Sequence, residues 1–111
     1  MLEVVRPSEK AKRQLITLKR NFGIDNWNVL CRWAICLSLS DGTEPSRTPP
    51  KSPSNIEMSW RTFAGPFSHA FTAILKLRFT KMVEHSSAIS FSDYFDSHLE
   101  RGLAKLLDTK H

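Results

Sequence analysis

The sequence predicts a mainly α-helical, oligomeric fold with short strands. A basic amphipathic helix is expected before residue 23, and a second helix that is apolar around most of its circumference follows it directly. The chain has 111 residues, so we expect one domain with a modest core. A domain of this size has few other elements to cover so apolar a helix, which indicates burial between subunits.

A strand and the basic helix are predicted first. Residues 2–6 favour a short strand that ends at Pro7. Ser8 is a suitable N-cap for a helix, and Gly23 is a suitable stop because it accepts the left-handed conformation common past a helix end. Apolar residues between them recur at spacings of four, three and four, which places them on one helix face. They are Ala11, Leu15, Leu18 and Phe22.

The apolar helix is expected to start from a cap at Asp25 or Asn26 and to run to about Ser40. Few polar residues interrupt its surface, so it has almost no polar face. It could be buried entirely within one chain, but the small size of the domain favours a subunit interface. The expected interface residues are Trp27, Leu30, Trp33, Ile35 and Leu37.

The rest of the chain reads as a loop followed by a strand and two helices. Residues 43–55 contain four prolines among serine, threonine and lysine, which is typical of a loop. The strand and the two helices are expected within residues 56–107. Too little chain lies on each side of the loop for a domain boundary, so residues 2–42 belong with the rest in one domain, 1–111.

The elements after the loop follow from local patterns. Apolar and polar residues alternate over residues 56–60, which is the two-residue period of a strand. Gly65 and Pro66 end this strand, and proline fits the first turn of the next helix. Ser92 or Asp93 is expected to cap the last helix. The long helix between them carries Phe67, Ala70, Phe71, Ile74, Leu75 and Met82 on one broad face.

The clearest functional signal is a concentration of positive charge on the first helix. Residues 6–20 hold six Lys or Arg against the single Glu9, a local charge of +5 that equals the net charge of the whole chain. Such a localised surface can neutralise phosphates and release their counterions, which favours DNA or RNA; the alternative is a solvated face kept basic for solubility. The expected contact residues are Arg6, Lys10, Lys12, Arg13, Lys19 and Arg20.

No catalytic, metal or cofactor site is predicted. The four histidines have no metal-binding spacing, and the glycines are too few for a phosphate-binding loop. Asp93, Asp96 and Glu100 could form one acidic row on the last helix, but charged helix surfaces are far commoner than metal sites. The tryptophans occupy core positions, which favours packing over base stacking. We therefore expect a protein that is not an enzyme.

The composition, 41% hydrophobic and 24% charged, is that of a soluble chain. Residues 1–7 lack the features of a signal peptide, and no apolar run approaches the ~20 residues of a membrane span. Cys31 and Cys36 lie five positions apart in one helix, so their thiols point in different directions and cannot pair. We therefore expect a cytoplasmic protein with reduced core cysteines and no contact with membranes.

Several segments, in order, resemble known DNA-associated proteins. They are the basic helix, the turn at Gly23 and Ile24, residues 36–42 (Cys-Leu-Ser-Leu-Ser-Asp-Gly) and residues 98–102 (His-Leu-Glu-Arg-Gly). The N-terminal part resembles the ribbon-helix-helix module of small DNA-binding repressors. More specifically, roughly residues 2–107 resemble the DNA sulfur modification protein DndE family.

This resemblance implies a role in DNA phosphorothioation, in which sulfur replaces a non-bridging phosphate oxygen. It implies a non-catalytic subunit that binds duplex DNA, with a nicked duplex as the proposed ligand, and that forms homotetramers. The implied partners are an SMC-like ATPase, a sulfurtransferase-like subunit and a cysteine desulfurase. The resemblance also places the basic residues of the first helix on the DNA-facing surface.

Two other functions stay open at this stage. One is a scaffold that holds the phosphorothioation enzymes together, and the other is a ribbon-helix-helix transcriptional regulator. In such regulators, strand side chains enter the major groove and read bases. Here the strand offers only Arg6 as a donor, and Glu3 would repel phosphate, so we do not expect base readout.

Overall fold

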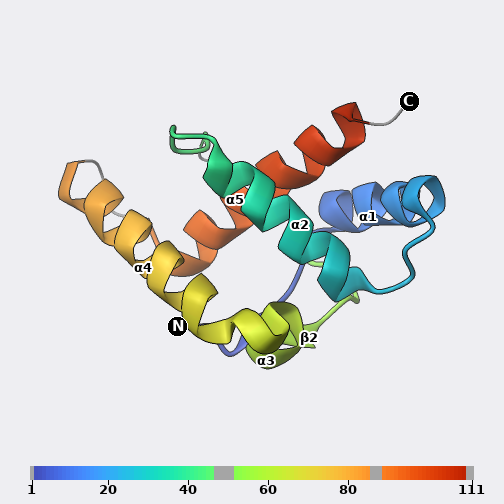
Figure 1. The fold of residues 1–111 in the computed structure, drawn as a ribbon, viewed down its shortest axis with the longest axis horizontal. Coiled ribbons are helices and arrows are strands. Elements are labelled where there is room, and N and C mark those ends of the chain that lie inside the picture. The colour runs from blue at the N-terminus through green and yellow to red at the C-terminus, as the bar shows by residue number, and fades with distance from the viewer. Residues whose placement is uncertain (1, 47–51, 86–88, 110–111) are drawn as a thin grey trace.

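The computed structural model describes residues 2–46, 52–85 and 89–109, and it is mainly helical with one small sheet (Figure 1). This confirms the predicted fold class of helices with short strands. Within the described ranges, no helix is both long and apolar enough to cross a membrane. In chain order the elements are β1 (Val4–Val5), α1 (Glu9–Phe22), α2 (Trp27–Ser40), β2 (Met58–Ser59), α3 (Trp60–Ala64), the 3-10 helix η1 (Gly65–Phe67), α4 (Ser68–His85) and α5 (Phe91–Asp108).

The two strands pair with each other within the chain. β1 and β2 are antiparallel, with Val4 opposite Ser59 and Val5 opposite Met58. The side chain of Val5 is 1% exposed and belongs to the core. The sheet therefore fastens the start of the chain to the segment that enters α3.

Both predicted ends of α1 are confirmed. The Oγ atom of Ser8 accepts a hydrogen bond from the backbone N–H of Ala11, at 3.1 Å. Gly23 ends the helix in the left-handed conformation, with φ of 67°, and its N–H donates to the carbonyl of Lys19. A side chain would be strained at this φ, which explains the glycine at the turn into α2.

The centre of the molecule is the crossing of α2 and α5 (Figure 1). Gly102 of α5 faces the backbone of Ala34 in α2, and a Cβ at Gly102 would lie 1.8 Å from the Ala34 carbonyl oxygen. The absent side chain lets the two backbones come into contact. This close approach allows α5 to cover the inner side of α2.

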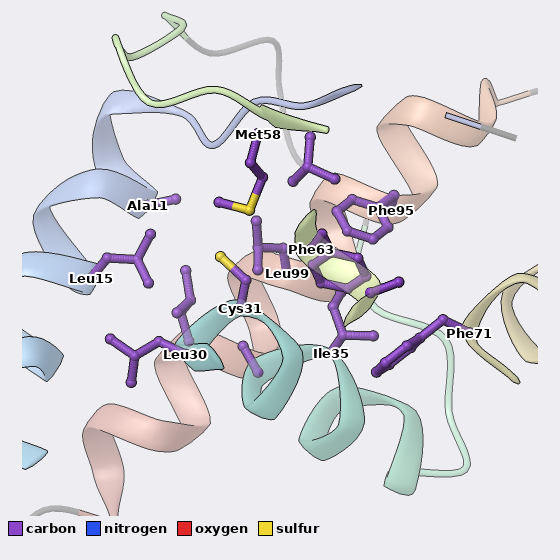
Figure 2. Packing of buried hydrophobic residues seen from close by; sticks show 14 of the residues in the cluster. Ala11, Leu15, Leu30, Cys31, Ile35, Met58, Phe63, Phe71, Phe95 and Leu99 are labelled. Atoms are coloured by element: carbon purple, nitrogen blue, oxygen red, sulfur yellow. The ribbon is translucent and has the colours of Figure 1, made fainter. Parts of the chain in front are cut away.

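One face of α2 is completely buried within the single chain. Leu30, Cys31, Ala34 and Ile35 are each 0% exposed, and they pack against residues of α1, α3 and α5 (Figure 2). Phe63 of α3 lies in this core, with its ring centroid 5.1 to 5.2 Å from those of three other rings. These rings are Trp60, Phe71 and Phe95.

Two predicted boundaries were wrong, and capping explains both. The strand expected over residues 56–60 is limited to β2, because the Oγ atom of Ser59 caps α3 by accepting from the N–H of Thr62 at 3.0 Å. The last helix was expected to be capped by Ser92 or Asp93. It begins earlier, because the Oγ atom of Ser90 accepts from the N–H of Asp93 at 3.0 Å.

Candidate nucleic-acid interface

The basic face of α1 points away from the core. Ala11, Leu15 and Leu18 form the buried side of the helix. On the opposite side lie Arg13 and Arg20, which are exposed and seven residues apart, so they sit almost above one another. Lys10 and Ile16 flank them and are exposed as well. The outer surface of α1 is therefore cationic, with one apolar side chain among the charges.

Three of the six predicted contact residues are engaged by neighbours. Nζ of Lys12 donates to Oδ1 of Asn55 at 2.6 Å, and Nζ of Lys19 lies 4.4 Å from the ring centroid of Trp27. These contacts hold the two lysines on one flank of α1 without removing their charge. Arg6 forms an ion pair with Glu57, so its charge is compensated.

The other three predicted contact residues have no carboxylate partner among the described ranges. These residues are Lys10, Arg13 and Arg20. The structure therefore divides the six predicted residues into three groups. Three are exposed without a carboxylate partner in the described ranges, Lys12 and Lys19 are held by neighbouring side chains, and Arg6 is paired with a carboxylate. The contacts of Arg6 and Lys12 that contribute to this division span more than 40 positions of sequence, so helical periodicity does not reveal them.

The start of α1 is tied to the end of the proline-rich loop. The N–H of Glu9 donates to the carbonyl of Ser52 at 2.9 Å, and Oγ of Ser54 donates to the carbonyl of Pro7 at 2.7 Å. The first of these bonds satisfies a backbone donor of the first helical turn that has no partner inside the helix. The orientation of the basic helix is thus fixed at its N-terminal end.

The predicted oligomer-interface residues of α2 fall into three groups. Leu30 and Ile35 lie in the core of the single chain, and this part of the prediction is corrected, since neither side chain reaches the surface. Trp27 and Leu37 are partly buried against the core. Trp33 is 45% exposed. The argument that one chain cannot cover α2 was wrong for its inner face, because α1, α3 and α5 do cover it.

Two of the motifs that carry the family resemblance, residues 36–42 and 98–102, lie in contact. Ser38 near the end of α2 and His98 of α5 are both fully buried, and Oγ of Ser38 lies 2.7 Å from Nδ1 of His98. Arg101 donates from Nε to this hydroxyl at 2.9 Å and from Nη2 to the Ser38 carbonyl at 2.7 Å. Residues 36–42 and 98–102 therefore form one polar junction between α2 and α5.

The same junction holds the first part of the loop after α2. Arg101 also donates to the carbonyl of Thr43 at 2.9 Å, and Arg78 of α4 donates to the carbonyl of Leu39 at 2.9 Å. The hydroxyl of Tyr94 donates to Oε1 of Glu44 at 2.8 Å. These bonds connect helices α2, α4 and α5 through the loop backbone.

Ser38, His98 and Glu44 are residue types of hydrolytic triads, but their setting does not suit catalysis. The Ser38 hydroxyl is inaccessible and already accepts a hydrogen bond from Arg101. Nε2 of His98 lies 3.6 Å from Oε1 of Glu44, and burial, followed by the nearby Arg101, lowers the pKa of His98 to about 4. The imidazole is therefore neutral at pH 7 and serves packing and hydrogen bonding.

The acidic row expected on the surface of α5 is partly buried, at Asp96 and Glu100. Burial, then repulsion from Asp93 and Glu100, raises the pKa of Asp96 to about 7. Across residues 2–46, 52–85 and 89–109, no three His, Cys, Asp or Glu side chains are placed to hold a metal ion.

Cys31 is buried as expected, with its pKa raised to about 12 by desolvation. Cys36 was expected in the core but is exposed.

Comparison with known proteins decides the family. Residues 5–111 match the family described as DNA sulphur modification protein DndE. The chain belongs to the DndE family. A comparison with curated protein sequences gave no significant match.

Crystal structures of other DndE proteins have the same fold. One is DndE from Escherichia coli B7A, involved in DNA phosphorothioation modification; it is 22% identical, with a TM-score of 0.75, over 96% of this chain and 99% of that one. The other is a DndE G21/24K mutant involved in DNA phosphorothioation, 21% identical, with a TM-score of 0.73, over 97% and 99% of the chains. At this identity the likeness concerns the fold.

Two of the motifs that suggested the family also hold α2 and α5 together. Of the four segments on which the DndE resemblance rested, residues 36–42 and 98–102 build the junction of α2 and α5, including Gly102 at the crossing. The sequence identified them as family features without predicting that they touch. Their separation of about 60 positions hides the contact from any local pattern.

Proposed function

We propose that this chain is a non-catalytic DNA-binding subunit in DNA phosphorothioation, which contacts duplex DNA, including nicked duplex, through the outer face of α1. The observation that carries the proposal is the set of exposed cations on a helix whose inner face and N-terminal end are both fixed. These cations are Lys10, Arg13 and Arg20.

The spacing of the cations suits a phosphate backbone. Arg13 and Arg20 are separated by about 10 Å along the helix axis, which is the rise of about three base pairs of duplex. Lys12 and Lys19 add a second row on one flank, where Asn55 and Trp27 hold them in place. Cationic side chains that are already held in place lose less conformational freedom on binding than free ones do.

Phosphate contact is better supported than base readout. β1 is paired with β2, Val5 is buried, and Arg6 is occupied by Glu57, so this strand presents few donors to a groove. A ribbon-helix-helix transcriptional regulator needs such donors. Contacts to phosphates alone give affinity without sequence information, so we assign the choice of sequence to partner subunits.

We also propose that the protein acts in the cytoplasm as a homo-oligomer, most simply a tetramer. Trp33 and the neighbouring Phe22 support this proposal, since they are 45% and 37% exposed and stack edge to face with centroids 6.2 Å apart. Its proposed partners are an SMC-like ATPase, a sulfurtransferase-like subunit and a cysteine desulfurase. An exposed aromatic pair is typical of a protein contact.

A charge-reversal experiment tests the DNA contact. We expect the double variant Arg13→Glu, Arg20→Glu to bind labelled duplex at least about tenfold more weakly than the wild type, because two phosphate contacts become repulsive. Fluorescence anisotropy on intact, nicked and single-stranded DNA, at several salt concentrations, measures this change. The wild type should also show the steeper dependence on salt.

The matched control carries the same charge change elsewhere. Lys76 and Lys81 are exposed on α4, so Lys76→Glu, Lys81→Glu lowers the net charge equally without altering α1. If both double variants lose affinity to the same extent, binding depends on overall charge, and the assignment to α1 is wrong. A scaffold role remains the second candidate function. It is favoured by an apolar groove between α2 and α4, which could receive a partner protein.

A further inference from the structure

An apolar groove lies between α2 and α4. In Figure 1, α4 and α1 lie on opposite sides of α2. Its volume is about 610 Å³. Its α2 wall includes Trp33, Cys36 and Leu39, and its other wall includes Phe67 of η1 and Ile74 of α4. A groove of this size can accept several large side chains.

The outer face of α4 extends this apolar surface. Phe67 is 56% exposed, Ile74 46% and Leu77 57%, while Phe71 and Leu75 of the same helix region are buried. The three exposed residues recur at helical spacing over about 15 Å, three turns of helix. An apolar stripe of this length beside a groove matches the way an amphipathic helix is received.

Arg32 places an uncompensated positive charge at the edge of the groove. Its Nη1 donates to the carbonyls of Phe63 at 2.8 Å and Thr62 at 3.4 Å. No carboxylate of the described ranges pairs with it, although the guanidinium has further N–H donors. Lys81, exposed and seven residues after Ile74, adds positive charge on the groove side of α4.

We propose that this groove binds an acidic amphipathic helix from another protein. The apolar stripe of that helix would fill the groove, and one of its carboxylates would pair with Arg32. Charge distinguishes this occupant from a second copy of the chain, whose contact we place at Phe22 and the edge of Trp33 that meets it, outside the groove. A second copy seated through this face would bring its own Arg32 and Lys81 towards the same positive edge.

A pair of matched peptides tests the proposal on the unmodified protein. The first is a helical peptide of about 18 residues, with leucines at helical spacing on one face and glutamates beside them. The second replaces every glutamate by glutamine, and a third uses lysine. Titration calorimetry should show the Glu peptide binding roughly tenfold more tightly than the Gln peptide, with no binding by the Lys peptide.

A groove variant locates the binding. Ile74→Glu puts a negative charge in the groove at an exposed position, and it should abolish binding of the Glu peptide. Binding should also shift the fluorescence of Trp33, and Trp33→Phe should lose that shift. DNA affinity should be unchanged in Ile74→Glu, so failure of this proposal and failure of the α1 proposal give different results.

Three results would overturn the proposal. Equal affinity for the Glu and Gln peptides would remove the role of charge. Unchanged peptide affinity in Ile74→Glu would place the peptide elsewhere. If light scattering shows that the wild type is an oligomer and that Ile74→Glu dissociates it, the occupant is a second copy. The peptide comparison alone decides the matter if the variant does not fold.

Discussion

The last two helices, α4 and α5, are of equal length, 18 residues each, but they use their apolar residues differently. α5 buries Tyr94, Phe95, Leu99 and Leu103 in the core and adds a buried polar junction. α4 buries much less and leaves Ile74 and Leu77 about half exposed. Apolar content alone therefore does not determine how deeply a helix is buried. The two helices differ because α5 crosses α2 closely at Gly102 and forms hydrogen bonds to it through His98 and Arg101.

The largest effect is expected from Gly102→Ala, which should weaken the packing of α5 against α2. The added Cβ would meet the Ala34 carbonyl, so the helices must separate, and we expect a loss of at least about 3 kcal/mol in the free energy of unfolding. Urea denaturation followed by circular dichroism measures this loss. Gly42→Ala is the control, because nothing lies within 4 Å of a Cβ there. Equal stability of the two variants would contradict the observed crossing.

Leucine truncation sharpens the contrast between the two helices. Leu99→Ala removes a side chain that is 1% exposed and should cost about 3 kcal/mol of unfolding free energy through lost burial and a cavity. Leu77→Ala on α4 removes one that is 57% exposed and should change stability by less than about 0.5 kcal/mol. Thermal unfolding of both variants compares them directly. A large cost at Leu77 would mean that α4 is covered in solution.

A smaller effect concerns the acidic row of α5. The pKa of Asp96 is raised to about 7, so the folded state binds more protons there than the unfolded state between pH 4 and pH 7. The protein should therefore lose stability at this site as the pH rises from about 4 to about 7. Asp96→Asn should raise the free energy of unfolding by about 1 kcal/mol at pH 8, after allowance for solvent screening, and have little effect near pH 4.

Two features make this pH experiment specific. His98 works in the opposite direction, because its pKa is lowered to about 4 and its contribution to stability is lost as the pH falls below 6.5. The wild-type profile between these limits is therefore flattened, and Asp96→Asn should restore a rise with pH. Asp108→Asn, at an exposed position at the end of the same helix, is the control, and an identical profile in both variants would rule out the role of Asp96.

The N-terminal half was predictable because its information is local. Ser8 and Gly23 mark the ends of α1, and the apolar spacing between them gives its inner face. The outward direction of Arg13 and Arg20 follows from the same periodicity. What the charges touch was not predictable, since the partners of Arg6 and Lys12 come from distant parts of the chain.

The errors came from tertiary context. Trp60 continues the alternation of the preceding strand, yet Ser59 caps a helix there, and capping prevailed over periodicity. The prediction for Leu30 and Ile35 failed because α5 covers both residues. α5 can come this close to α2 only because Gly102, far along the sequence, has no side chain. Buried polar groups such as His98 are equally hard to find, because only their distant partners distinguish them from surface residues.

The crossing of α2 and α5 has a consequence for synthesis on the ribosome. The inner face of α2 is made early, but the helix that covers it comes about 60 positions later. Until α5 has left the exit tunnel, Leu30, Ala34 and Ile35 face water or other hydrophobic surfaces. The nascent chain therefore cannot complete its fold before α5 has emerged, and a stalled product ending before α5 would be a substrate for chaperones.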